Sequence, residues 1–256
     1  MSEFEPLTDF FVPELTDVYD IDYVGNPSPK DQAELIALVY ANLGIFRPDM
    51  AEKAPELITP QIEALYQTHP DTALEPFVTF NLRSASEFRA LLRNFDKEQP
   101  GKRQTTLYDK LWDKYDLDEL NSRRTDGQAE PTIGLIRGHV LSAPENDYNE
   151  LGLIGTNKTL AEQRQLAIGQ TLLNITDYTA IQAMRRETGQ RLDQQPLDTQ
   201  TYTRFPQLKD RSLYSFSCVG FADWRYDQLY LDGSRVHAGQ AGGVRISLGL
   251  ENQQQK

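Results

Sequence analysis

Apolar residues recur at helical spacing in the N-terminal part of the chain, directly after the pair Ser28-Pro29. Serine is a favoured N-cap, and proline suits the first helical position because an N–H there would have no partner. Gly44 can end the helix, since glycine adopts the left-handed conformation easily. The pattern therefore predicts a helix from about residue 29 to Gly44. Its apolar face comprises Leu35, Ile36, Leu38, Val39 and Leu43.

The same two periodicities predict further elements up to residue 141. Thr59-Pro60 predicts a second helix start, and Ser84 or Ser86 is expected to cap a third helix. Polar and apolar residues alternate over 77–82, which predicts a strand, and a second strand is expected at 132–141. Another helix is marked by Leu107, Leu111, Trp112 and Tyr115.

The C-terminal half combines two predicted helices with several strands. Thr159 and Glu162 have the spacing of a capping box, which predicts a helix that reaches Leu173. Thr176 predicts the start of the next helix and Gly189 its end. Residues 197–205 and 213–249 follow, with short strand patterns and glycine loops. Because the strands do not alternate regularly with helices, the order favours an α+β fold.

Composition divides the chain into three regions. Residues 1–27 contain seven acidic residues and no basic one, which predicts an acidic extended arm. Residues 28–130 form a helix-rich N-terminal region. Residues 131–256 form a second domain, and segment 213–249 stands out in it for six glycines after Val219.

The formal net charge of −12 excludes tight nucleic-acid binding as the expected function, because such binding depends on Lys and Arg against phosphate. No run of about 18 apolar residues occurs, so no membrane span is expected. The N-terminal sequence lacks the basic and apolar regions of a signal peptide, which predicts synthesis in the cytoplasm. Location on a virion and display on a cell surface both stay open.

The residue types that carry most enzyme chemistry are sparse or isolated. Cys218 is the one cysteine, which excludes an intramolecular disulfide and a cysteine-based zinc cluster. The histidines, His69, His139 and His237, lie in three separate contexts. No phosphate-loop, dinucleotide-binding or GxSxG motif occurs. The sequence therefore predicts no catalytic residues, no metal and no cofactor.

Residues 160–249 carry two predicted helices and then three short motifs in a set order. The motifs are Leu197-Asp198 with Thr201-Tyr202-Thr203-Arg204-Phe205, Trp224-Arg225 before Gln228-Leu229-Tyr230-Leu231, and Gly243-Val244-Arg245-Ile246-Ser247. In this order they resemble the C-type-lectin-like fold in its formylglycine-generating-enzyme (sulfatase-modifying) form. The resemblance implies a C-type-lectin-like domain over 131–256. The enzymes of that family use a pair of active-site cysteines, so their activity is not expected in a chain with Cys218 alone.

Segment 213–249 further resembles the variable region of proteins diversified by diversity-generating retroelements. In those proteins the changing residues lie on one face of a C-type-lectin-like scaffold and bind partners, as in phage–host or cell-surface recognition. The resemblance implies buried scaffold positions at Trp224, Leu229, Leu231, Val244, Arg245 and Ile246. It implies exposed, ligand-binding positions at Val219, Phe221, Ala222, Asp223, Arg225, Tyr226, Asp227, Tyr230, Asp232, Ser234 and His237.

The leading hypothesis is therefore a non-enzymatic recognition protein whose partner is an unknown protein or cell-surface ligand. Two alternatives stay open. The first is an enzyme of unknown type with a cleft between the two halves, for which carboxylates and Arg137 or His139 are candidate residues. The second is a structural virion or assembly subunit whose acidic arm, residues 1–27, extends onto a neighbour.

Overall fold

The structure, a computed structural model, describes residues 28–46, 48–68, 74–79, 85–97, 103–107, 132–137, 153–168, 171–192, 196–199, 201–210, 218–226, 228–235 and 242–248. Within these ranges the chain is a mixture of helices and antiparallel-rich sheet, so the predicted α+β class is confirmed. The predicted acidic arm at 1–27 lies outside the described residues. Most of the helix predicted around Leu111 and Tyr115 also lies outside them, and Leu107 belongs to a strand.

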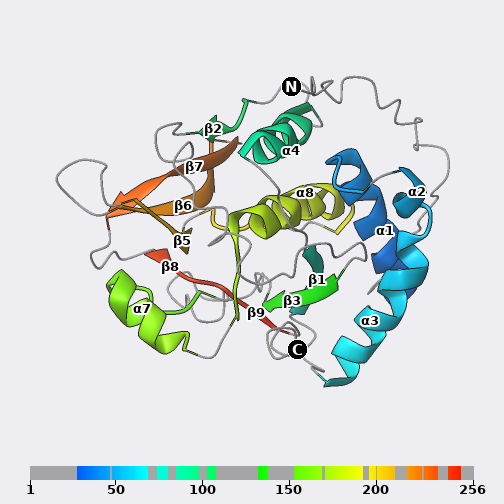
Figure 1. Cartoon of the computed structure of the whole chain (residues 1–256), viewed down its shortest axis with the longest axis horizontal. Coiled ribbons are helices and arrows are strands. Elements are labelled where there is room, and N and C mark those ends of the chain that lie inside the picture. The colour runs from blue at the N-terminus through cyan, green and yellow to red at the C-terminus, as the bar shows by residue number, and fades with distance from the viewer. Residues whose placement is uncertain are drawn as a thin grey trace, which may run out of the picture.

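The helices and strands alternate irregularly along the chain (Figure 1). The helices are α1 (Pro29–Asn42), α2 (Pro48–Ala51), α3 (Ala54–Thr68), α4 (Ala85–Lys97), α7 (Leu160–Leu166) and α8 (Ile175–Leu192). The strands are β1 (Leu74–Thr79), β2 (Thr106–Leu107), β3 (Thr132–Arg137), β4 (Thr171–Leu172), β5 (Tyr202–Asp210), β6 (Cys218–Arg225), β7 (Gln228–Arg235), β8 (Gly242–Gly243) and β9 (Ile246–Leu248).

Two helix starts form as the sequence predicts. Ser28 caps α1 and exchanges hydrogen bonds with Asp31, and Pro29 occupies the first position. Thr159 and Glu162 form the predicted capping box of α7. Gly44 follows α1 with a φ of +72°, a left-handed conformation in which a side chain would be strained. In these places the local chemistry of the chain fixes the helix ends.

Four predicted helix boundaries are wrong. Pro60 lies inside α3, because Ile58 and Ile62 are buried against the core and carry the helix past the exposed proline. α7 ends at Leu166, and Leu172 instead enters β4, which pairs with β9. The predicted Thr176 cap is replaced by Asn174, whose Oδ1 accepts the Asp177 N–H at 2.8 Å, and α8 runs on through the predicted stop at residue 189.

The strands form two sheets. The four-stranded sheet has the order β1-β3-β9-β4, and the five-stranded sheet has the order β2-β7-β6-β5-β8. α8 runs through the middle of the molecule and contacts α1, α4 and β1 (Figure 1). One hydrophobic core includes residues of α1, α4, α8 and both sheets, so residues 28–130 and 131–256 share it. The long β6–β7 hairpin is held on one side by this core.

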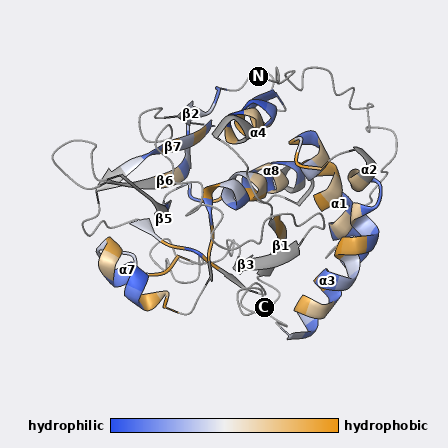
Figure 2. Ribbon diagram, viewed as in Figure 1, coloured by the Kyte–Doolittle hydropathy of each residue, from blue (hydrophilic) through white to orange (hydrophobic). Residues whose placement is uncertain are grey.

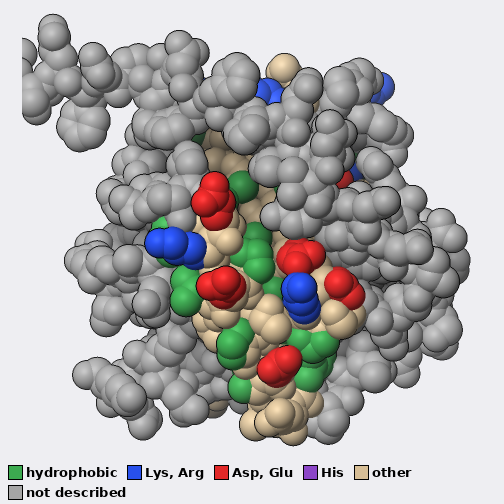
Figure 3. All heavy atoms as spheres, turned by 90° about the vertical axis from the view of Figure 1, so that its right-hand side faces the viewer, with side chains coloured by type: hydrophobic (Ala, Val, Ile, Leu, Met, Phe, Trp, Pro, Cys, Tyr) green, Lys and Arg blue, Asp and Glu red, His purple; other side chains and the backbone are tan. Residues whose placement is uncertain are grey.

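The helices on one side of the molecule are amphipathic, and the ribbons of α1 and α3 change between orange and blue along their length (Figure 2). In the face that Figure 3 presents, acidic and basic side chains of the described residues are interspersed with hydrophobic ones. A large patch of one charge is not seen there among these residues. Among the described residues, every helix is too short or too polar to cross a lipid bilayer.

Candidate recognition surface

Alternating side chains on β5, β6 and β7 give the five-stranded sheet two different faces. The register places Arg204 opposite Phe221, Phe221 opposite Asp232, and Asp223 opposite Tyr230. One face, called here the core face, carries Thr203, Phe205, Ala222, Leu229 and Leu231, each at 0% exposure. The opposite face, called here the polar face, carries the paired residues just named and their neighbours: Tyr202, Arg204, Phe221, Asp223, Arg225, Tyr230 and Asp232.

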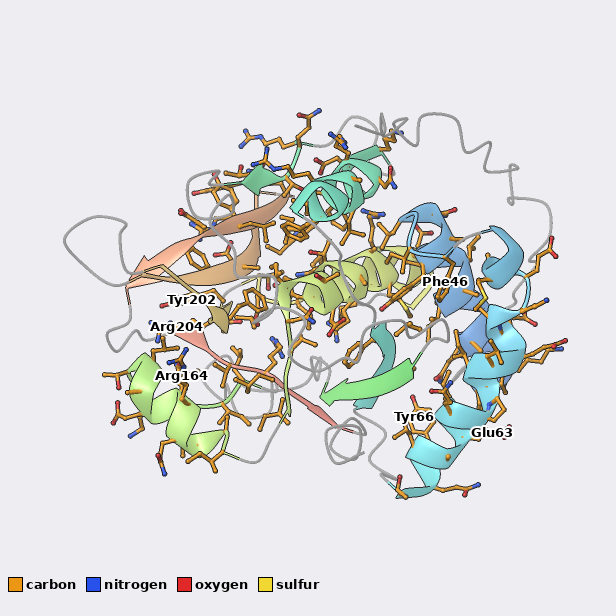
Figure 4. All side chains as sticks on the ribbon, in the orientation of Figure 1. Phe46, Glu63, Tyr66, Arg164, Tyr202 and Arg204 are labelled. Atoms are coloured by element: carbon orange, nitrogen blue, oxygen red, sulfur yellow. The ribbon has the colours of Figure 1, made fainter. Side chains whose placement is uncertain are left out.

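One end of the polar face is covered. The ring of Phe221 packs on Tyr202 with 5.1 Å between ring centroids. Arg204 is 1% exposed, and its Nη1 donates to the Lys158 carbonyl oxygen at 3.2 Å, beside α7. Figure 4 shows Tyr202 and Arg204 near the end of β5 that approaches α7, the helix that carries Arg164. This end is therefore a packing contact between the sheet and the α7 segment.

The other end of the polar face reaches solvent at the β6–β7 hairpin. The Arg225 side chain is 42% exposed, and the side chain of its ion-pair partner Asp223 is 9% exposed. The Arg225 guanidinium lies 4.6 Å from the Tyr230 ring centroid and 5.9 Å from that of Phe221. Tyr226, which follows in the turn, is 73% exposed. A fixed guanidinium and a projecting phenol thus stand side by side in the chain at the hairpin end.

The Asp223–Arg225 pair joins the two ends of the polar face. The Nε of Arg225 donates to Asp223 Oδ1 at 2.9 Å and to Oδ2 at 3.0 Å, and Nη2 also donates to Oδ2. Burial raises the pKa of the Asp223 carboxyl above its usual value, and the hydrogen bonds from Arg225 offset this only in part. Those same hydrogen bonds raise the pKa of Arg225, which stays charged. The exposed end of the pair is therefore the positive one.

Tyr226 holds an unusual backbone conformation. Its φ is +54°, in the left-handed region that bulky residues seldom occupy. The turn joins residues 225 and 228, which pair in the β6–β7 register, so it has only two residues. Two-residue hairpin turns need positive φ and ordinarily use Asn, Asp or Gly there. A tyrosine kept in this place at a cost in stability is more typical of a functional position than of a structural one.

Behind the core face lies a buried polar cluster centred on Asp198. Its carboxylate accepts hydrogen bonds from Thr201 Oγ1 at 2.5 Å, Thr203 Oγ1 at 2.6 Å and Tyr178 Oη at 3.0 Å. Arg245 Nη2 donates to this carboxylate at 2.7 Å, and the Arg245 and Asp198 side chains are 2% and 0% exposed, respectively. This cluster connects α8, the turn before β5, and the segment between β8 and β9.

The charges of the cluster are balanced within it. Burial alone would raise the pKa of Asp198, but the charge of Arg245 and the hydrogen bonds from Thr201 and Thr203 lower it. Burial, followed by the nearby Asp198 charge, raises the pKa of Tyr178 well above 10.0. Near neutral pH the Asp198 carboxyl is therefore ionised and the Tyr178 hydroxyl is neutral. Such a satisfied ion pair positions the chain, and nothing in its environment prepares Asp198 to exchange protons near pH 7.

The cluster also positions the β6–β7 hairpin. The Trp224 N–H donates to the Asp198 carbonyl oxygen at 3.0 Å, and the Trp224 ring packs edge-on against Phe95 of α4 at 6.4 Å. The Gln182 side chain of α8 bonds both the N–H and the carbonyl oxygen of Leu197. The hairpin end that carries Arg225 and Tyr226 is therefore anchored one residue away from a rigid core.

The structure separates the predicted ligand-binding positions into several groups. The expected exposure is wrong for Phe221, Ala222 and Asp223, which are 8%, 0% and 6% exposed. Ala222 belongs to the core face, since it alternates with its neighbours, whereas Phe221 and Asp223 are covered by Tyr202 and Arg225 on the polar face. A continuous run of neighbouring residues on a strand cannot all face solvent.

The remaining predicted positions differ in their surroundings. Arg225 and Tyr226 are exposed, as expected, and Tyr230 and Asp232 are partly buried. Val219 and Ser234 are partners in the β6–β7 register. Asp227 and His237 lie outside the described residues. His139, a candidate residue of the alternative enzyme hypothesis, and the loop that follows it also lie outside them.

The predicted scaffold positions are buried for the most part. Leu229, Leu231 and Val244 are 0% exposed and Arg245 is 2% exposed, as expected. Trp224 and Ile246 are partly buried. The role of Asp198 was not predicted, although the spacing of Asp198, Thr201 and Thr203 carries a usable signal. A carboxylate followed at short distance by two hydroxyl residues can be satisfied when it is buried.

The described residues hold no group of three or more His, Cys, Asp or Glu side chains arranged for a metal ion. Comparisons of the chain with protein-family models, with curated proteins and with solved structures gave no match.

Proposed function

We propose that this chain is a non-enzymatic recognition protein that binds its partner through the hairpin end of the polar face. The observation that carries the proposal is Tyr226, a large aromatic side chain that is 73% exposed and held in a left-handed turn beside Arg225. Tyr and Arg are the residue types that most often dominate binding energy at protein interfaces. The hydrogen bonds to Asp223 also hold the Arg225 side chain in place, which reduces the entropy lost on binding.

The proposal includes a C-type-lectin-like scaffold whose binding residues diversify in the manner of retroelement variable proteins. What supports it is the separation between the two faces of the hairpin. Leu229 and Leu231 are buried in the core face, whereas Arg225 and Tyr226 are exposed. Substitution of exposed residues away from such packing changes stability by about 0.5 kcal/mol or less. A surface of this kind can change without loss of the fold.

Binding can be tested without a known partner by selection from a displayed library of random peptides. The immobilised wild-type protein is expected to enrich peptides that bind it in solution, with affinity lost in the double variant Arg225→Ala/Tyr226→Ala. The matched control is Arg93→Ala on α4, an exposed arginine far along the chain from the hairpin. Equal binding to all three proteins, or enrichment of peptides that bind elsewhere, would contradict the proposal.

The diversification can be tested by sequencing the genes of close relatives together with their neighbourhood. A template repeat, a reverse transcriptase gene and substitutions concentrated at adenine-containing codons are expected. The substitutions should include residues 225, 226 and 230 and avoid 222, 229 and 231. Substitutions spread evenly over both faces of the hairpin would exclude this form of diversification.

A further inference from the structure

The guanidinium of Arg225 has two edges that can each hold a carboxylate, and the chain uses one of them. Nε and Nη2 make up the side edge, and both donate to Asp223. Nη1 donates no hydrogen bond to any described residue, and the Arg225 side chain is 42% exposed. An arginine carries five N–H donors in a fixed plane, so the end edge, Nη1 with the second hydrogen of Nη2, stays open to solvent.

The open edge is held in place from three directions. Asp223 fixes the rotation of the guanidinium through the side edge, while the Tyr230 ring lies 4.6 Å away and the Phe221 ring 5.9 Å away. A free arginine side chain loses much rotamer entropy when it binds a ligand. Here that loss has largely occurred on folding, so the open edge is prepared for a planar acceptor with two oxygens.

We infer that the open edge of Arg225 binds a carboxylate of the partner, with Tyr226 packing against the side chain or backbone beside that carboxylate. The inference rests on the proposed function and adds the chemistry of the partner: a protein segment with an acidic side chain or a free C-terminus. The polarity of the ion pair supports it, because the Arg225 side chain is 42% exposed while the Asp223 side chain is 9% exposed, so solvent meets the positive end. Because the overall charge of −12 repels an acidic partner at a distance, the attraction to Arg225 acts only at close approach, where salt screens it less.

The test is a titration of the full-length protein with acetate at constant ionic strength, followed by NMR on the arginine Nε–Hε signals. Saturable shifts are expected at Arg225, with a dissociation constant about tenfold lower than at Arg93, the exposed reference arginine of α4. Acetamide, which has the same shape and no charge, should give no saturable shift. Similar shifts at Arg225 and Arg93 would overturn the inference.

Inorganic phosphate serves as a second probe and distinguishes a carboxylate site from a general oxyanion site. Weaker binding of phosphate than of acetate is expected, and equal or tighter binding would overturn the assignment to a carboxylate. The variant Arg225→Lys keeps the charge but lacks the two-donor edge, so the acetate-induced shift of the Tyr226 backbone amide should be lost. Persistence of that shift would contradict the inference, provided thermal unfolding shows that the variant is folded.

This experiment can fail independently of the proposed function. If acetate gives no preferential shift but selected peptides bind at the hairpin end, the carboxylate chemistry is wrong and the recognition function stands. If acetate binds Arg225 but no peptide depends on the hairpin end, the oxyanion site stands and the recognition function is wrong.

Discussion

Arg245 and Asp198 form an ion pair at 2.7 Å that is almost completely withdrawn from solvent. The pair joins the segment after β8 to the turn before β5, two regions 47 residues apart in sequence. Arg245 also donates through Nε to Thr203 Oγ1 at 2.9 Å, and this threonine bonds Asp198 in turn. The arrangement fixes the C-terminal strands to the core that supports the β6–β7 hairpin.

Removal of one partner of this pair should destabilise the protein severely. Arg245→Met keeps the approximate volume but leaves the Asp198 carboxylate buried without its counter-ion, which costs about 3–5 kcal/mol of unfolding free energy. Urea denaturation followed by circular dichroism measures the change. Arg93→Met on the exposed surface of α4 is the control and should stay within about 0.5 kcal/mol of wild type. A small effect of Arg245→Met would show that the carboxylate finds another partner.

The two faces of β6 should tolerate substitution differently. Ala222→Leu adds volume at a position that is 0% exposed, and such overpacking costs about 1–3 kcal/mol. Arg225→Lys, three positions along the same strand, changes an exposed side chain but keeps a positive charge beside Asp223, and should cost much less. Thermal unfolding of the two variants compares them directly. A similar loss of stability in both would mean that the faces are not separated as described.

Tyr226 should be replaceable with a gain in stability and a loss of binding. Asparagine tolerates the left-handed conformation, so Tyr226→Asn is expected to stabilise the fold by up to about 1 kcal/mol. The variant should bind peptides selected on the wild type more weakly, because the exposed ring is gone. Denaturant titration and a binding titration on the same preparation measure both effects. Unchanged binding would remove Tyr226 from the recognition surface.

Glycine should be required at position 242 because the Tyr202 ring leaves no space for a side chain, and not because of the backbone conformation of Gly242. A Cβ on Gly242 would overlap that ring, so Gly242→Ala is expected to destabilise the protein by about 1–3 kcal/mol. Gly242→Ala should cost less stability in a protein that already carries Tyr202→Ala than it costs in the wild type. A double-mutant cycle of unfolding free energies measures this coupling. Additive effects would show that the two residues do not contact each other.

Asp223 should make stability depend on pH in the opposite sense to Asp198. The pKa of Asp223 in the folded state is raised above 3.8. As the pH rises above about 3.8, Asp223 therefore loses its proton in the unfolded chain before it does so in the folded protein. The free energy of unfolding falls over this range and levels off once the pH has passed the folded-state pKa. The folded-state pKa of Asp198 is lowered, so its stabilisation is present above 3.8 and is lost as the pH falls through the folded-state value. Unfolding free energies of wild type and Asp223→Asn across pH 3 to 7 isolate the first effect. Parallel curves for the two proteins would contradict it.

Local chemistry determined several parts of this fold from the sequence. The Ser28 and Thr159 caps sit where the hydroxyl and the following carboxylate predict them, because capping involves residues three apart in sequence. Leu229 and Leu231, for which the resemblance implied buried positions, are core residues. Arg225 and Tyr226, for which the resemblance implied exposed positions, are exposed.

The sequence pattern failed where distant segments supply the partners. Leu172 continues an apolar helical pattern but pairs with Ile246, so β9 converts its segment into a strand. Pro60 stays within α3 because burial of Ile58 and Ile62 offsets the missing hydrogen bond. Burial of Phe221 depends on Tyr202, which lies on another strand.

The sequence by itself determined the mixed class of the fold and the helix caps at Ser28 and Thr159, since these caps depend on residues close together in the chain. The tertiary structure decided which side of the β6–β7 hairpin is covered, and that Asp198 and Arg245 neutralise each other inside the protein. It also decided that the ion pair of Arg225 and Asp223 exposes its positive end. These properties arise from contacts across strands and between sheets, which depend on how the whole chain packs and not on any local pattern.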